Sequence, residues 1–173
     1  MKIHVTGNAG AGKTTLAREL GARFNLPVYS LDTVIWASGW RKRSEAERAP
    51  DIENLLNKKA WVIEGVSADV RNEADLTLWL DPPTYRCMAR CIARCFRFGF
   101  KTRPELPPNC PEINILWRAI GIVWRFPRLI GHTLLHEAAA NPKTVHRVRF
   151  ATDAYPIISA ALGPASDPDP KLD

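Results

Sequence analysis

One eight-residue stretch near the start of this 173-residue chain restricts its fold more than any other part of the sequence. Residues 7–14 read GNAGAGKT and match the pattern G-x-x-x-x-G-K-[ST]. A mainly apolar run at residues 2–6 precedes the stretch, and residues 12–24 follow it with helical periodicity. A glycine-rich turn between a strand and a helix directs backbone N–H groups at one point, where the helix N-terminus adds partial positive charge. The sequence therefore predicts a strand-loop-helix unit that binds a phosphate chain.

The side chains of this loop predict which ligand it holds. Lys13 can reach the β- and γ-phosphates of a nucleotide, and the Thr14 hydroxyl can ligate Mg²⁺. We therefore expect ATP and Mg²⁺ as cofactors and Lys13 as a catalytic residue. The expected nucleotide-binding residues are Asn8, Ala9, Gly10, Ala11, Gly12, Lys13, Thr14 and Thr15. The alternative is a tight turn with a coincidental lysine.

Apolar runs further along the chain alternate with helical segments and predict an α/β fold. Strands are expected at residues 2–6, 26–31, 61–63, 76–80 and 144–150, and a polar surface helix at 45–57. Unbroken apolar runs such as 76–80 are typical of strands buried on both faces of a parallel sheet with right-handed crossovers. We expect a single domain over residues 1–162 and a disordered tail, rich in Pro and Asp, over 163–173.

Two carboxylates come at the ends of the second and third predicted strands. In a parallel sheet these ends meet at the edge that also carries the phosphate loop. Glu64 can hold metal-bound water there, so it joins Thr14 as a candidate metal ligand. Asp32 can accept a hydrogen bond from an acceptor hydroxyl, and its alternative role is to cap a helix that starts at Thr33.

Arginines repeat at helical spacing over residues 86–97. Arg86, Arg90, Arg94 and Arg97 form one stripe, while the opposite half holds Cys87, Met88, Cys91, Ile92, Cys95 and Phe96. We expect the second set to pack on the body and the first to face phosphate, with Arg90 and Arg94 as catalytic residues. A solvated basic face is the alternative.

A second arginine stripe follows on an apolar segment at residues 113–135, where Arg118 and Arg125 share a face with Asn114 and Gly121. We expect a helix with one buried face here and count both arginines as acceptor-binding candidates. A proline-rich loop at 99–111 joins the two stripes. Together they predict a helical lid, at about residues 84–128, that closes over the transferred phosphate.

Charge and cysteine spacing limit the classes of partner and site. The net charge of +6 suits a phosphate-bearing partner, whether nucleotide, metabolite or nucleic acid. Cys87, Cys91 and Cys95 stand four apart, which is not the paired spacing of a zinc site. No signal-like segment precedes the loop, and charges interrupt residues 113–135, so we expect a cytoplasmic protein without membrane partners.

Several stretches together resemble the nucleoside monophosphate kinase group of P-loop proteins, and within it the branch of adenylate-kinase-like or DNA topology modulation proteins. The stretches are GNAGAGKT at 7–14, LDTVIW at 31–36, GW at 39–40, WVIEG at 61–65, LWLD at 78–81, KTRP at 101–104 and NCPE at 109–112. The resemblance implies a P-loop NTPase fold with a five-stranded parallel sheet of order 2-3-1-4-5. It also implies an acceptor site near Asp32 and Trp36 and a lid that carries Arg90 and Arg94.

The chain departs from the family pattern at two places. Glu64 stands where the family usually has Asp, and residues 66–68 replace an element that ends in an arginine. That arginine normally helps to hold the acceptor's phosphate, and Arg71 is close enough downstream to replace it.

The leading hypothesis is a phosphotransferase that passes the γ-phosphoryl group of Mg-ATP to a small acceptor, a nucleoside monophosphate or another metabolite. A nucleotide-dependent DNA-associated regulator and a slow ATPase switch are the alternatives. The sequence shows no recognition helix or nucleic-acid-binding aromatic motif, so nucleic acid is the less favoured partner. We expect a monomer or a homodimer.

Overall fold

The structure is a computed structural model that describes residues 1–99, 102, 106–142 and 144–162. The predicted disordered tail at 163–173 lies outside these residues. So do parts of the predicted loop at 99–111 and of the KTRP stretch. No helix within the described ranges is long and apolar enough to cross a membrane.

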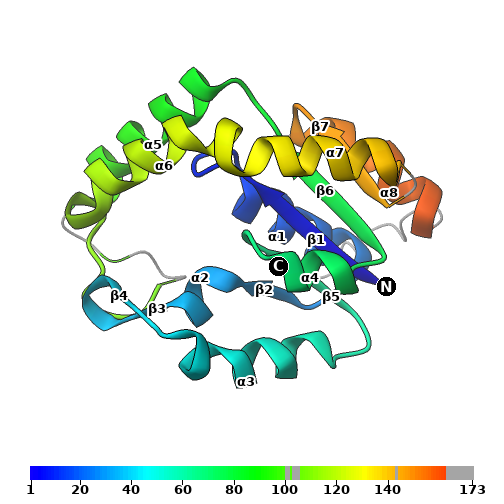
Figure 1. Cartoon of the computed structure of the whole chain (residues 1–173), viewed down its shortest axis with the longest axis horizontal. Coiled ribbons are helices and arrows are strands. Elements are labelled where there is room, and N and C mark those ends of the chain that lie inside the picture. Colours follow the sequence, from blue (N-terminus) through cyan, green and yellow to red (C-terminus); the bar gives the residue numbers. More distant parts are fainter. Residues whose placement is uncertain (100–101, 103–105, 143, 163–173) are drawn as a thin grey trace, which may run out of the picture.

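Five parallel strands form the central sheet (Figure 1). β1 (Lys2–Gly7) lies in the middle, between β5 (Trp61–Glu64) and β6 (Leu76–Leu80). β2 (Val28–Ser30) and β7 (Val145–Val148) form the two edges. Numbered along the chain, these strands have the order 2-3-1-4-5, so the predicted fold class and strand order are confirmed. The central position of β1 puts the loop that follows it at the middle of the sheet's carboxyl edge.

Helices connect the strands and cover the sheet. They are α1 (Lys13–Phe24), α2 (Leu31–Ile35), α3 (Glu45–Leu56), α4 (Ala68–Glu73), α5 (Thr84–Phe98), α6 (Leu116–Phe126), α7 (His132–Ala140) and α8 (Ala154–Leu162). A π-helical segment, Pro127–Gly131, joins α6 to α7. A short antiparallel hairpin of β3 (Trp36–Ala37) and β4 (Arg41–Lys42) follows α2, and short 3-10 turns span Ser38–Trp40, Glu112–Ile115 and Ala151–Asp153.

The two faces of the sheet pack on different helices because side chains alternate along each strand. Ile3 and Val5 of β1 face a core that includes α1 and α8. Trp61 and Ile63 of β5 pack with α4 on the other face, and Trp79 of β6 packs there with α6 and α7. The sheet is therefore covered on both sides, as its apolar strands predicted.

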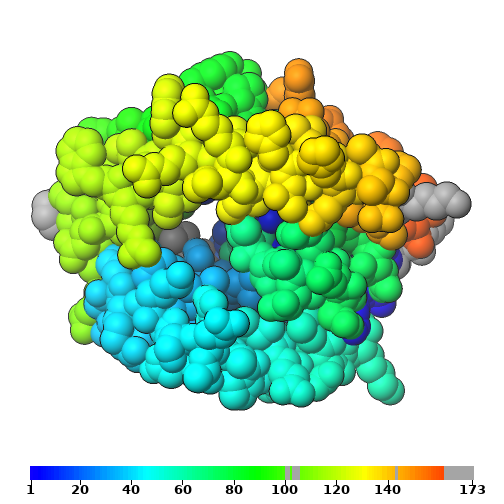
Figure 2. Space-filling view, in the orientation of Figure 1, coloured from blue at the N-terminus to red at the C-terminus, as the bar shows by residue number. Residues whose placement is uncertain are grey.

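The lid helices α5 and α6 lie side by side and continue into α7 along one side of the molecule (Figure 1). The space-filling view is hollowed between these helices and the segment that contains α2 and α4 (Figure 2). The β3–β4 hairpin closes one end of the hollow, since Trp40 Nε1 donates to the Pro111 carbonyl oxygen at 2.8 Å. The lid and the acceptor side are thus in direct contact.

The prediction for the apolar half of α5 was only partly right. Cys87 and Cys91 are buried, but Ile92 and Phe96 are exposed, Phe96 by 88%. On α6, Trp117 and Trp124 are also exposed, where the sequence suggested a single buried face. The buried residues are only Cys87 and Cys91 on α5 and Ala119, Val123 and Phe126 on α6, so each helix buries a narrow strip and leaves large residues outside it at the surface.

Candidate functional site

The loop at residues 7–14 lies against α5, and Gly10 makes this approach possible. A Cβ atom at Gly10 would lie 2.4 Å from the Cys87 carbonyl oxygen and 3.0 Å from Cys91 Sγ. Gly10 also has φ of +76°, in the left-handed region that side chains disfavour. Two independent constraints therefore require glycine here. The helix that carries the lid arginines is packed directly on the phosphate loop.

Asn8 ties the loop to the second lid helix. Its Nδ2 donates to the Val123 carbonyl oxygen of α6 at 2.9 Å, and its Oδ1 accepts from the Ala9 N–H at 2.8 Å. The residue four positions after Val123 is Pro127, which has no N–H to offer that carbonyl. Asn8 thus supplies a donor in place of the missing N–H of residue 127. Lys13 Nζ in turn donates to the Asn8 carbonyl oxygen at 2.9 Å, which holds the ammonium group beside the loop.

Thr14 and Glu64, the two predicted metal ligands, are adjacent in the structure. Thr14 Oγ1 donates to Glu64 Oε1 at 3.3 Å, and Ser30 Oγ donates to the same oxygen at 2.5 Å. Glu64 is only 4% exposed, yet both hydroxyls compensate for the burial of its charge.

This donor set fits Mg²⁺. The ion prefers hard oxygen ligands and usually keeps several waters while it takes one or two protein ligands and the phosphates of a substrate. Thr14 and Glu64 supply oxygens of that kind at the edge of the phosphate loop. Among the described residues, no group of three or more His, Cys, Asp or Glu side chains could form an all-protein metal site. The residues therefore suit a cation bound together with a nucleotide.

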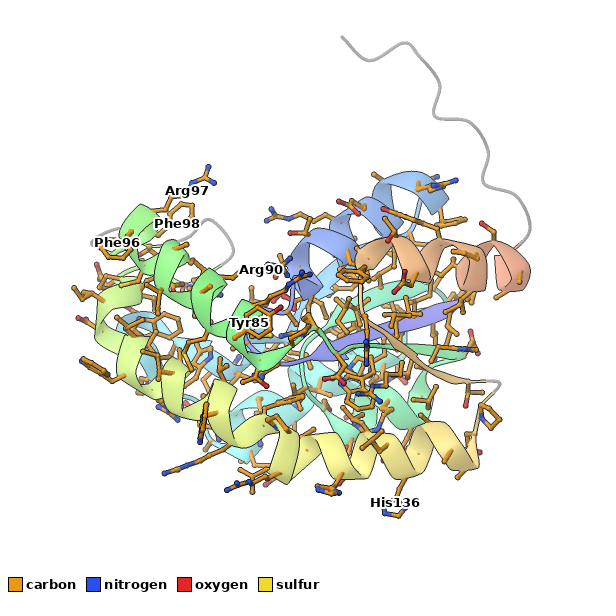
Figure 3. The ribbon with its side chains drawn as sticks, turned by 90° about the horizontal axis from the view of Figure 1, so that it is seen from above. Tyr85, Arg90, Phe96, Arg97, Phe98 and His136 are labelled. Atoms are coloured by element: carbon orange, nitrogen blue, oxygen red, sulfur yellow. The ribbon has the colours of Figure 1, made fainter. Side chains whose placement is uncertain are left out.

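Two arginines of α5 point to the same region. Arg90 Nη1 donates to the Ala11 carbonyl oxygen at 3.1 Å, directly at the phosphate loop (Figure 3). Arg94 Nε donates at 3.1 Å to Oε2 of Glu112, a carboxylate that is 3% exposed. Arg97, by contrast, projects away from the body at the end of α5, where its guanidinium lies 5.2 Å from the centre of the Phe98 ring (Figure 3). Of the four arginines in the stripe, Arg90 and Arg94 line the cleft described next.

A cleft of about 1030 Å³ unites most of the predicted site. Its lining includes Gly10, Gly12, Lys13, Thr14, Thr15, Asp32, Trp36, Glu64, Arg90, Arg94, Arg118 and Arg125. On the acceptor side the Arg118 guanidinium lies 5.0 Å from the centre of the Trp36 ring, and Trp36 meets Trp40 edge-on at 5.4 Å. The cleft therefore joins the phosphate loop, both lid helices and the β3–β4 hairpin.

Two predictions for the acceptor side differ from the structure. Arg71 is not part of the lining of the cleft, because it pairs with Glu137 of α7 instead. Asp32 does line the cleft, but it does not cap α2. Ser30 does so, since its Oγ accepts from the Asp32 N–H at 3.3 Å. The alternative reading of Asp32 as a cap is thus wrong, and the position of Arg71 does not support its prediction as a replacement for the family arginine.

Several cleft residues were missed from the sequence. They are Arg18, Trp40, Lys42, Arg48 and Trp117. Arg18 could have been found, because it follows Thr14 by one helical turn on α1. The others come from the hairpin and from α3 and α6, which reach the cleft only through tertiary packing.

His4 lies buried in β1 near this site, and its Nε2 is 3.0 Å from the Gly65 carbonyl oxygen. Burial is the main cause that lowers the pKa of His4 from 6.5 to about 3; the hydrogen bond to Gly65 opposes this shift, and the positive charges of Arg71 and Lys13 add to it. His4 is therefore neutral at physiological pH and is not a source of protons for chemistry there.

Comparisons with known proteins define the class of fold. A shikimate kinase from Acinetobacter baumannii, solved with shikimate, superposes with a TM-score of 0.56 at 18% identity over 92% of each chain. A deoxyadenosine kinase from M. mycoides, solved with dATP, gives 0.52 at 11% identity over 95% of this chain and all of the other. A shikimate kinase from Aquifex aeolicus gives 0.50 at 20% identity over 95% of this chain and all of the other.

The chain thus shares the fold of these proteins, a five-stranded parallel sheet flanked by helices. No protein-family model matches the sequence. No curated protein matches it either.

Proposed function

We propose that this protein is a phosphotransferase that moves the γ-phosphoryl group of Mg-ATP to a small acceptor molecule. The observation that carries the proposal is the cleft in which Lys13, the Thr14–Glu64 pair and Arg90 and Arg94 converge on one phosphate loop. Phosphoryl transfer needs positioning and charge stabilisation rather than covalent chemistry from the protein, and these groups provide both. Similar folds in shikimate kinase and deoxyadenosine kinase agree with this class of reaction.

Each residue has a distinct part in this reaction. Lys13 leaves the Asn8 carbonyl and binds the β- and γ-phosphates, where its charge offsets the charge that develops on the leaving oxygen. Thr14 and Glu64 hold Mg²⁺, which, when bound, neutralises negative charge on the phosphates. Arg90 and Arg94 bind oxygens of the transferring group with planar pairs of N–H donors. Closure of the lid over the cleft excludes water and so favours the acceptor over hydrolysis.

The acceptor side of the cleft favours an anionic molecule. Lys42, Arg48, Arg118 and Arg125 line the cleft, where the carboxylates are Asp32 and Glu64, and Glu64 is hydrogen-bonded to Thr14 and Ser30. Cations at this density are stable together only when anions lie among them. Asp32 is placed to orient an acceptor hydroxyl, and Trp36 offers it an apolar wall. Nucleoside monophosphates and hydroxylated carboxylates both meet this description.

We also propose that the chain is related to the adenylate-kinase-like branch and acts in the cytoplasm.

A phosphotransfer screen tests the proposal. Purified protein with Mg-ATP is incubated with nucleoside monophosphates, nucleosides, shikimate and other hydroxylated acids, and ADP release and phosphorylated product are measured. We expect at least one anionic acceptor to raise ADP release well above the rate with water. Lys13→Ala should abolish this increase, whereas Lys59→Ala, which changes an exposed lysine away from the cleft, should not.

The result also separates the alternatives. If no acceptor raises ADP release while ATP is still hydrolysed slowly, the protein is an ATPase switch and the phosphotransferase proposal is wrong. Non-specific contacts to DNA phosphates weaken steeply with salt. If duplex DNA nevertheless binds tightly at physiological salt and this binding changes with ATP, the protein is a DNA-associated regulator and the phosphotransferase proposal is wrong.

A further inference from the structure

Glu112 is a buried carboxylate at the base of the lid that the reaction described above does not use. It begins the short turn Glu112–Ile115 that leads into α6, and it is 3% exposed. A carboxylate removed from water is costly unless a cation or hydrogen-bond donors compensate for it. Arg94 of α5 does so, through the 3.1 Å bond from its Nε to Glu112 Oε2. The pair therefore links the two helices of the lid.

This bond fixes how Arg94 meets the cleft. A guanidinium group is planar and carries its N–H donors in a rigid fork, so one bond at Nε restricts the orientation of the whole group. Because Glu112 occupies Nε, the two terminal nitrogens of Arg94 stay available for an anion in the cleft that Arg94 lines. Without Glu112, a long arginine side chain would sample many rotamers and would lose that entropy on each encounter with phosphate.

Glu112 is itself held from the acceptor side of the cleft. Trp40 Nε1 donates to the carbonyl oxygen of Pro111, the residue before Glu112, at 2.8 Å. The Trp40 backbone N–H contacts Cys110 Sγ at 3.4 Å. Trp40 also meets Trp36, which lines the acceptor half. A continuous set of contacts thus runs from the acceptor hairpin through Pro111 and Glu112 to Arg94.

We propose that Glu112 is a positioning residue that holds the Arg94 guanidinium towards the transferring phosphate, with Trp40 fixing the segment of Glu112 to the acceptor side. The inference rests on the proposed phosphotransferase function and adds to it. Arg94 is then in place only when the β3–β4 hairpin is docked on the lid. When the β3–β4 hairpin is not docked, Arg94 is less ordered and stabilises the transferring phosphate less. Hydrolysis of ATP in the absence of an acceptor is therefore slower.

A second arginine–glutamate pair provides a matched control. Arg71 and Glu137 join α4 to α7 with side chains that are 11% and 30% exposed, and neither residue lines the cleft. Glu137→Gln makes the same chemical change as Glu112→Gln and removes charge from the same kind of pair. It should leave transfer unchanged, so any shared effect of the two variants reports on stability and not on the reaction.

The experiment measures the affinity of each variant for MgADP alone and for MgADP with aluminium fluoride, a mimic of the transferring phosphoryl group. We expect Glu112→Gln to weaken binding of the aluminium fluoride complex about a hundredfold, as displacement of a positioned group by about 1 Å can. Affinity for MgADP should change by less than about threefold on the same argument. Turnover with an acceptor from the screen should fall in kcat and not rise in KM. In an Arg94→Ala background, Glu112→Gln should have no further effect.

Each result bears on a different claim. If the wild type binds MgADP no more tightly with aluminium fluoride than without it, the proposed function fails. If aluminium fluoride tightens MgADP binding equally in the wild type and in Glu112→Gln, the positioning role is overturned. Additive effects of the Glu112 and Arg94 substitutions would also overturn it. Higher turnover in Glu112→Gln would mean that Glu112 withholds Arg94, which also overturns it.

Two milder variants keep the test informative if Glu112→Gln does not fold. Glu112→Asp keeps the charge but shortens the reach to Arg94, and Trp40→Phe removes only the Nε1 donor to Pro111. Both should reduce affinity for the aluminium fluoride complex by about tenfold or more while MgADP affinity is kept. Wild-type behaviour of both variants would refute the proposal.

Discussion

The hydrogen bond from Asn8 to Val123 offers a quantitative test of how the phosphate loop is attached to the lid. Asn8→Ala removes the 2.9 Å bond to the Val123 carbonyl, and Val123 is fully buried. It also removes the 2.8 Å bond from the Ala9 N–H. A buried carbonyl left without a donor costs about 1–3 kcal/mol, so we expect a loss of about 2 kcal/mol in the free energy of unfolding. For a chain of this size, that loss lowers the melting temperature by roughly 4–8 °C.

Pro127 makes the argument specific. The Val123 carbonyl needs Asn8 because residue 127 has no N–H, so Pro127→Ala should restore an intrahelical donor. In that background we expect Asn8→Ala to cost about half as much, roughly 1 kcal/mol, since only the Ala9 bond is then lost. Urea unfolding of the wild type, both single variants and the double variant measures this coupling. An equal cost of Asn8→Ala in both backgrounds would refute the reasoning.

Four further substitutions test other parts of the site. Arg90→Ala and Arg94→Ala should each lower kcat by about 10³ or more with little change in Mg-ATP affinity, as measured by steady-state kinetics and calorimetry; small, equal effects would assign both arginines to solvent. His4→Asn should flatten the acid side of the stability profile, because the unfolded chain binds a proton between pH 6.5 and about 3 that folded His4 does not. The contribution of neutral His4 to the free energy of unfolding is complete above pH 6.5 and falls on acidification by up to about 5 kcal/mol near pH 3. An unchanged pH dependence of the free energy of unfolding in urea between pH 7 and 4 would contradict this. Gly10→Ala should lower the free energy of unfolding by at least about 1–2 kcal/mol because of the positive φ at residue 10. It should also displace α5 from the loop, since the new Cβ would lie 2.4 Å from the Cys87 carbonyl oxygen. Wild-type stability and wild-type Mg-ATP affinity of this variant would contradict the prediction.

The sheet could be predicted because each of its strands is marked locally. The run at β6, Leu76–Leu80, is apolar apart from Thr77 and is followed by Asp81 and two prolines, so its composition predicts burial on both faces. The phosphate loop was equally clear, because its glycine pattern and its strand and helix context are all local. The carboxyl ends of parallel strands share one edge of the sheet, and this rule predicts that Glu64 lies near Thr14, as the structure shows.

The rest of the site depends on contacts that no local pattern encodes. β3 and β4 have two residues each, too few to show alternation, so the hairpin that brings Trp40 to Pro111 was missed. The helical period correctly placed the arginines of α5 on one face. It could not show which residues of the apolar face pack against the rest of the protein. Phe96 therefore looked buried and is not. Arg71 was close in sequence to the acceptor side, yet Glu137, 66 residues later, takes it away.

The binding of Mg-ATP tests the central claim most directly, because the whole account rests on a triphosphate held by the loop at residues 7–14. Calorimetric titration and thermal unfolding of the wild type and Lys13→Ala, with Lys59→Ala as the control, measure it. Wild type and control should bind with one site, and ATP at a hundredfold over its dissociation constant should add about 2.7 kcal/mol to the free energy of unfolding. Lys13→Ala should lose most of this stabilisation. Absence of binding by the wild type, or equal binding by Lys13→Ala, would contradict the account.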